Sequence, residues 1–192
     1  MLRQILNAVV MLLVLTLITG FIYPLVMTGL AQALYPFQAN GSIFTRDGVP
    51  VGSNLIGQNF SAPGYFHGRP SAAGQDGYDA TASGGSNLGP TNQKLIDTVA
   101  DNLKKVREEN GLDASANVPS DLVLASASGL DPEITPAAAY LQVERIAKVR
   151  GLGVDQVHQL VSNHIQERQW GVFGEPRINV LELNLALDSL RP

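Results

Sequence analysis

The sequence contains no cysteine, and its 192 residues include only three histidines, His67, His158 and His164. The absence of cysteine excludes disulfides, thiol nucleophiles and cysteine-ligated metals. The histidines form no H-E-x-x-H motif, and the sequence has neither a G-x-x-x-x-G-K-[ST] phosphate loop nor a G-x-S-x-G nucleophile motif. We therefore expect no catalytic residue, no metal site and no cofactor bound directly by this chain.

Charge is missing from one long stretch of the chain. Arg3 is followed by no Asp, Glu, Lys or Arg until Arg46. The remainder holds all 17 acidic residues and all but one of the 13 basic residues. This distribution predicts an apolar N-terminal segment joined to a mildly acidic soluble domain. Basic residues scattered over an acidic domain argue against a nucleic-acid binder.

The uncharged stretch predicts a transmembrane helix over residues 5–25. Its apolar run over residues 5–23 has nineteen residues, which as helix reach about 28 Å, close to the hydrocarbon thickness of a bilayer. Pro24 cannot donate a hydrogen bond to Gly20, so we expect the helix to kink or end near this point. Residues 26–37 are then a connector at the membrane interface, and residues 38–192 form the folded domain.

The orientation of this helix is indicated by only two positive charges. Arg3 and the terminal amine precede it, and no basic residue follows it closely, so the positive-inside rule places residues 1–4 in the cytoplasm. The domain then lies in the periplasm, and the chain is a single-pass protein of the inner membrane. The alternative is a cleaved signal peptide, because Ala31-Gln32-Ala33 matches an A-x-A site. The apolar run is longer than a usual signal, which favours a retained anchor.

The soluble part predicts an α+β fold with about three helices, several short strands and long glycine-rich loops. Residues 38–90 are rich in turn-forming residues and exclude long helices. Apolar stripes predict helices over residues 91–110, 135–151 and 154–166. Alternating leucines over residues 178–187 predict a half-buried strand, with a terminal helix as the competing interpretation.

Five polar residues of the soluble part are candidates for contacts. His67 and Arg69 stand side by side in a glycine-rich loop and suit an anion or the carboxylates of a partner. Alternatively, Arg69 ties the loop to its own backbone. Ser126, Ser128 and Asp131 invite a nucleophile interpretation, but small residues that permit close packing and an Asp-Pro turn explain them more simply.

Several blocks of the sequence together resemble the C subunit of the bacterial Kdp potassium-transporting ATPase. The resemblance covers nearly the whole chain, in order, and ASASGLDPEITP is its most specific part. The blocks are YPLVMTGLAQALYPFQANGS (23–42), LIGQNF (55–60), YFHGRPSA (65–72), ASGGSNLGPTN (82–92), VPSDLVLASASGLDPEITPAAA (118–139) and INVLELNLALD (178–188).

The resemblance implies an accessory, non-catalytic role in ATP-driven, high-affinity potassium uptake. It implies three partners: a channel-like potassium-binding subunit, a P-type ATPase subunit and a small single-span subunit. Members of the family are regarded as stabilisers of this assembly and as catalytic chaperones that raise the ATP affinity of the ATPase subunit. ATP and potassium are then handled by the complex rather than by this chain.

The expected topology limits this role. ATP is cytoplasmic, so a periplasmic domain affects ATP affinity only through an allosteric coupling between distant sites. Gly20 and Gly29 would allow partner helices to approach the span closely. A secreted hydrolase and an anchored solute-binding domain are the alternative functions, and the hydrolase would require cleavage after Ala33.

Overall fold

The computed structural model describes residues 1–190 and divides the chain into two compact units, residues 1–44 and the part from residue 45 onward. The first unit is mainly helical. The second is a folded domain of helices, two small sheets and long loops. The predicted fold class, an apolar N-terminal helix followed by an α+β domain, is confirmed.

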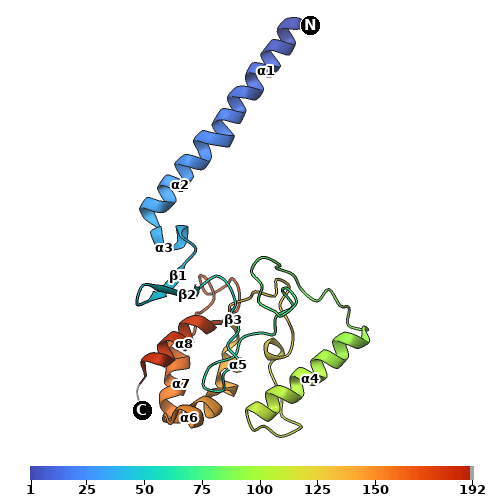
Figure 1. The fold of residues 1–192 in the computed structure, drawn as a ribbon, viewed down its shortest axis with the longest axis vertical. Coiled ribbons are helices and arrows are strands. Elements are labelled where there is room, and N and C mark those ends of the chain that lie inside the picture. Colours follow the sequence, from blue (N-terminus) through green and yellow to red (C-terminus); the bar gives the residue numbers. More distant parts are fainter. Residues whose placement is uncertain (191–192) are drawn as a thin grey trace. The chain divides into compact units, whose positions relative to one another are not determined.

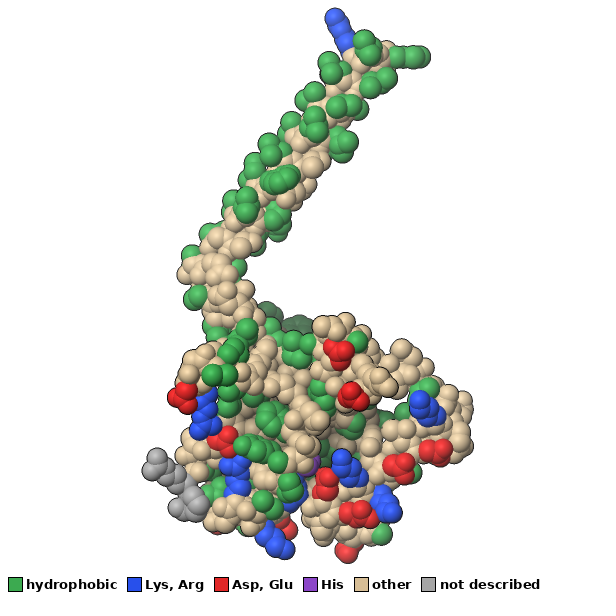
Figure 2. Space-filling model, in the orientation of Figure 1, with side chains coloured by type: hydrophobic (Ala, Val, Ile, Leu, Met, Phe, Trp, Pro, Cys, Tyr) green, Lys and Arg blue, Asp and Glu red, His purple; other side chains and the backbone are tan. Residues whose placement is uncertain are grey.

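One helix of 33 residues, Leu2–Leu34, dominates the first unit. It consists of α1 (Leu2–Leu17), a π-helical turn (Ile18–Ile22) and α2 (Tyr23–Leu34). Figure 2 shows hydrophobic side chains along its visible face, and none of its residues is buried. At 1.5 Å per residue such a helix reaches roughly 50 Å, which exceeds a hydrocarbon core of about 30 Å. Among the described residues it is the only helix long and apolar enough to cross a membrane.

The helix continues through Pro24, where the sequence predicts a kink or an end. The disturbance takes the form of the π-helical turn at Ile18–Ile22, and Pro24 falls in the first turn of α2. Because the chain is helical on both sides of Pro24, its missing amide removes one backbone hydrogen bond from the continuous helix, and the π-helical turn directly before it accommodates the ring.

Short elements follow the long helix. The four-residue helix α3 (Pro36–Ala39) places the ring of Phe37 5.6 Å from the ring of Phe44, edge to face. Strands β1 (Ile43–Arg46) and β2 (Val49–Ser53) pair in a two-stranded sheet. The turn between them is Asp-Gly with both residues at positive φ, the usual chemistry of a tight hairpin.

Five helices and one 3₁₀ turn form most of the regular structure of the second unit (Figure 1). They are α4 (Gln93–Glu109), the turn Ser120–Leu122, α5 (Pro136–Leu141), α6 (Val143–Arg150), α7 (Val154–Asn163) and α8 (Val180–Ser189). Strands β3 (Glu133–Ile134) and β4 (Ile178–Asn179) pair antiparallel between them. The three predicted helices are present, and the second is divided at Gln142.

The core lies among α5, α6, α7 and α8, which we call the helical region (residues 136–163 and 180–189). Its completely buried apolar side chains include Ile146, Val157, Val161, Leu183 and Leu187. The Thr135 hydroxyl caps α5 by accepting from the amide of Ala138, and Gly151 ends α6 in the left-handed conformation. Both helix boundaries were predicted from the sequence and are confirmed.

The predicted strand over residues 178–187 is wrong beyond its first two residues. Only Ile178–Asn179 is a strand, and the remainder is helix α8. The side chain of Asn179 accepts from the amide of Glu182 at 3.1 Å and so caps the helix. Val180, Leu183 and Leu187 have helical spacing and are buried, so the leucine alternation hid a second, helical period.

The loop region, residues 54–90, contains no helix or strand. It is nevertheless packed, since Phe66 is completely buried. The side chain of Asn184 accepts from the Phe66 amide at 2.8 Å and donates to its carbonyl at 2.9 Å. Gln142 makes the same pair of bonds with the backbone of His67, at 2.8 and 3.1 Å. Two buried amide side chains of the helical region thus hold the loop region in place.

Candidate functional site

Residues 126–131 form a central segment to which the loop region is attached. The hydroxyl of Ser71 donates to the carbonyl of Gly129 at 2.6 Å. The amide of Gly84 donates to the carbonyl of Ser128 at 2.8 Å. Two parts of the loop region that are distant in sequence therefore lie against this segment. They provide hydrogen-bond partners for its backbone, which belongs to no regular sheet.

Glycines make this close contact possible. A Cβ atom on Gly57 would lie 2.6 Å from the carbonyl oxygen of Asp131, and one on Gly85 would lie 2.9 Å from that of Ala127. Gly129 has a φ of +68°, and a Cβ there would lie 2.7 Å from a backbone nitrogen of the loop region. Only glycine fits these three positions without displacement of the backbone.

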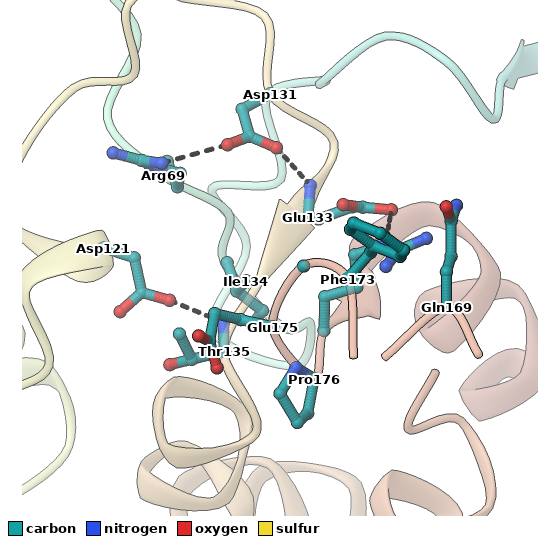
Figure 3. A pocket seen from close by; sticks show the side chains of 12 residues that line it. Arg69, Asp121, Asp131, Glu133, Ile134, Thr135, Gln169, Phe173, Glu175 and Pro176 are labelled. Carbon is teal, nitrogen blue, oxygen red and sulfur yellow. Dashed lines mark hydrogen bonds and ion pairs between the residues drawn. The ribbon is translucent and has the colours of Figure 1, made fainter. Parts of the chain in front are cut away.

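Arg69 and Asp131 form an ion pair at the edge of the central segment (Figure 3). Arg69 Nη1 donates to Asp131 Oδ2 at 3.0 Å, and Asp131 Oδ1 accepts from the Glu133 amide at 3.0 Å. Arg69 Nη2 also lies 3.4 Å from the carbonyl oxygen of Ala125. The carboxylate is thus fully engaged in orienting a guanidinium and the start of β3.

A second ion pair follows on β3. Arg177 Nε donates to Glu133 Oε1 at 2.8 Å, and Asp121 Oδ2 accepts from the amide of Thr135 at 2.6 Å (Figure 3). The side chains of both ion pairs are at most one-third exposed, and Asp121 is buried. Their charged groups are therefore held in place by direct contacts. Such contacts fix the positions of the charged groups before any ligand arrives.

An open cleft of about 500 Å³ lies between these groups. Its wall combines four carboxylates, two guanidinium groups and the ring of Phe173 (Figure 3). The lining residues are Arg69, Asp121, Asp131, Glu133, Ile134, Thr135, Gln169, Phe173, Gly174, Glu175, Pro176 and Arg177. A cleft that mixes fixed charges with an aromatic ring suits the side chains of a partner polypeptide.

Comparison with known proteins places the chain in a family. A profile described as "KdpC: K+-transporting ATPase, c chain" matches residues 5–189. The chain belongs to the KdpC family. A Gemmatimonas aurantiaca protein named "Potassium-transporting ATPase KdpC subunit" is 57% identical over 190 residues, which cover 99% of this chain and 94% of that protein.

Two other relatives carry the same name. The protein of Polaromonas naphthalenivorans is 56% identical over 185 residues, covering 96% of this chain and 94% of its own. That of Rhodopseudomonas palustris is 54% identical over 202 aligned positions and covers both chains completely. The family therefore shares the apolar helix as well as the domain, because the profile begins at residue 5.

Four of the predicted contact residues lie in or beside the central segment of this KdpC domain. Arg69 and Asp131 pair directly, and Ser126 is buried. The hydroxyl of Ser128 lies 3.4 Å from that of Ser126 and accepts from the amide of Leu130. The two hydroxyls thus contact each other and the local backbone, and Asp131 contacts the guanidinium of Arg69.

His67 lies apart, beside a smaller cavity of about 190 Å³. Its Nδ1 is 3.4 Å from Glu109 Oε2, and its Nε2 is 3.1 Å from the Ala62 carbonyl. Burial lowers the pKa of His67 below its ordinary value of 6.5, and the positive charge of Arg145 lowers it further, although Glu109 opposes this. Within residues 1–190, no group of three or more His, Asp or Glu side chains is arranged to hold a metal ion.

Gly20 and Gly29 lie on the long helix and are exposed. A Cβ on Gly20 would come no closer than 3.9 Å to Thr16, and one on Gly29 would meet nothing within 4 Å. Their smallness serves no packing within the first unit. A role in contacting a partner helix stays a prediction.

Sequence reasoning missed the buried polar residues of the helical region. Arg145 donates through Nε to Asn110 at 3.0 Å and through Nη2 to the Tyr65 carbonyl at 3.1 Å, and it also contacts the Pro63 carbonyl. Burial lowers the pKa of Arg145 from its ordinary value. No sequence signal marked Gln142 or Arg145, because neither belongs to the apolar stripe that predicted this helix.

Proposed function

We propose that this chain is a single-span accessory subunit of an ATP-driven potassium transporter. The match to the family over residues 5–189 carries the proposal, since relatives covered almost end to end are named as subunits of a potassium-transporting ATPase. The cleft supports a binding role, because its carboxylates orient arginines and backbone amides. The protein stabilises the assembly of a channel-like potassium-binding subunit, a P-type ATPase subunit and a small single-span subunit.

The direct test is restoration of the complex. In a strain lacking the chain, the proposal predicts a growth defect under potassium limitation and loss of the ATPase subunit from complexes purified through the channel-like subunit. The full chain restores both. Normal growth and intact complexes without it would contradict the proposal. Mass spectrometry of the mature N-terminus separates the alternative, because a hydrolase or solute-binding protein with a cleaved signal would begin after Ala33.

The proposed topology places the N-terminus in the cytoplasm and residues 38–192 in the periplasm. It rests on Arg3, which lies in the first turn of the long helix and is followed by no other charged residue of that helix. Because the chain has no cysteine, Ala114→Cys and Gln4→Cys each introduce a unique thiol. A membrane-impermeant maleimide applied to intact spheroplasts should label position 114 and spare position 4 until the cells are lysed. The reverse pattern would overturn the topology.

This topology makes the proposed effect on ATP affinity allosteric. The long helix is the only described element long and apolar enough to cross a bilayer, so we propose that the coupling runs through it and through the partner subunits. Gly20→Leu and Gly29→Leu should weaken complex assembly by preventing close helix approach. Ala31→Leu is the matched control for Gly29→Leu alone, since position 31 lies on the side of the helix opposite Gly29 but on the same side as Gly20. Equal behaviour of Gly29→Leu and Ala31→Leu would exclude glycine-mediated packing at Gly29.

The charged cleft is the proposed contact surface of the domain. Arg69→Ala and Arg177→Ala should each weaken complex assembly several-fold, because each removes a guanidinium held in position by an acid. Lys94→Ala, an exposed residue of α4, is the control. The stability of each variant is measured in parallel, so that loss of assembly at unchanged stability identifies a contact residue.

A further inference from the structure

A hairpin leaves the domain between α7 and β4. Its two arms are joined by the bridges Gln166–Arg177 and Gln169–Phe173, with four backbone hydrogen bonds of 2.8–3.0 Å across residues 166–177. An ion pair between Arg168 and Glu175 lies between the two bridges and also joins the arms. The excursion is therefore a defined structural element rather than an irregular connection.

The end of this hairpin consists of apolar side chains that point into solvent. Trp170 is 90% exposed, Val172 69% and Phe173 59%, and we call these three residues the aromatic tip. The rings of Trp170 and Phe173 meet edge to face at 5.9 Å. Leaving three large apolar side chains in water forfeits the free energy of burying them, which indicates that another surface covers them.

The backbone of the tip is also unusual. Trp170 has a φ of +53°, and Gly171 follows with a φ of +74°. A bulky side chain at positive φ is strained, and such strain persists where the surrounding structure enforces it. Here the strained residue is the most exposed of the large hydrophobic side chains described in the domain. The hairpin thus holds Trp170 outward at a cost in free energy.

We propose that the aromatic tip inserts into the interfacial layer of the lipid bilayer. Tryptophan and phenylalanine favour this layer, and the charged pair Arg168–Glu175 at the base of the tip matches the headgroup level. The tip is convex and holds three apolar side chains, too few for a stable protein interface of about 1,000 Å². The long helix tethers the domain to the membrane, which keeps the lipid surface at a high effective concentration.

This inference rests on the membrane anchoring given under Proposed function. It attaches the domain to the membrane at two points, through the helix and through the aromatic tip. Phe173 also lines the charged cleft, so insertion of the tip would fix the height of the cleft above the bilayer. A partner that is itself embedded in the membrane would then meet the cleft at a constant level.

The chain supplies its own reporter, because Trp170 is its only tryptophan. The full chain is reconstituted into phosphatidylcholine vesicles, with or without bromine on the acyl chains. We expect a blue-shifted emission, strong quenching by the brominated lipid and loss of quenching by aqueous acrylamide. As a control, Ile96→Trp in a Trp170→Phe background places the single indole on α4, where acrylamide should quench it and brominated lipid should not. Acrylamide quenching of Trp170 without quenching by brominated lipid would overturn the proposal.

Two further measurements separate the causes of a negative result. Alkaline carbonate extraction tests the anchor alone: a chain released by carbonate contradicts the anchoring, whereas a retained chain with a water-exposed Trp170 contradicts only the insertion of the tip. In the assembled complex, Val172→Cys carrying a nitroxide should be relaxed by oxygen and not by a water-soluble nickel chelate. A label that becomes inaccessible to both only after assembly would show that a protein partner covers the tip, and would overturn the proposal.

Discussion

In the helical region, completely buried side chains such as Leu183 and Val161 pack against one another, whereas the loop region contributes few buried apolar residues, among them Phe66. The loop region is held instead by hydrogen bonds to the central segment and by amide side chains reaching out of the helices. The helices thus form a scaffold that is stable through burial. The loops on it depend on specific polar contacts, and this arrangement is common where a surface serves binding.

The largest expected effect comes from breaking the helical region. Leu183→Ala removes a completely buried side chain and should lower the free energy of unfolding by about 3–4 kcal/mol. Unfolding of the detergent-solubilised chain, followed by circular dichroism in urea, measures this. Leu124→Ala is the control, since Leu124 is 36% exposed and should cost less than about 1 kcal/mol.

Substitution of Gly129 in the central segment should destabilise the loop region attached to it. Gly129→Ala combines a left-handed backbone with contacts of 2.7 Å to two backbone atoms, so we expect a loss of about 2–3 kcal/mol. Gly89→Ala, where a Cβ meets nothing within 4 Å, should be neutral or slightly stabilising. The same urea titration compares them, and equal stability of the two variants would show that the central segment does not constrain the loops.

The contact between the helical region and the loop region should weaken when Asn184 is replaced. Asn184→Leu keeps the size of the side chain but leaves the amide and the carbonyl of buried Phe66 without their partner. Each unsatisfied group costs about 1–3 kcal/mol, offset in part by the apolar replacement, so a loss of about 2 kcal/mol is expected. Proteolysis should also increase in the loop region. The exposed Asn117→Leu serves as the matched substitution, and a stable, protease-resistant N184L chain would refute this role.

The smallest effect concerns pH and His67. Its pKa in the folded chain is lowered, chiefly by burial. Below about pH 6.5, His67 is therefore protonated to a greater extent in the unfolded chain than in the folded chain. This contribution to stability is complete above the unfolded pKa and is lost as the pH falls toward the folded value. His67→Gln should reduce the loss of stability on acidification. An unchanged pH profile in urea titrations would show that His67 is not the group responsible.

The sequence predicted those parts of the fold that local patterns determine. The Thr135 cap and Gly151 terminus were readable because helix ends carry local chemistry. Helix α8 was misjudged because alternating leucines fit both periods, and the decisive signal was Asn179, whose capping side chain begins the helix. The loop region could be recognised as lacking long helices, but its path depends on contacts with residues far away in the chain.

The candidate site was predictable only in its components. Arg69 and Asp131 were each identified from their own motifs, and nothing in a single sequence shows that they pair across 62 positions. Trp170 and Phe173 carried no periodic signal, because a hairpin tip that faces away from the core follows no pattern of burial. Arg145 and Gln142 were hidden within an apolar helix, where only the folded structure reveals what they bind.

Hydrogen exchange of the full chain, with and without its partner subunits, tests most directly whether the charged cleft, whose walls include Arg69 of the loop region and Asp131 of the central segment, is the contact surface. We expect assembly to slow exchange in residues 66–72 and 126–133, while exposed amides of α6 and α7 are unaffected. Protection confined to α6 and α7, with residues 66–72 and 126–133 unchanged, would contradict it.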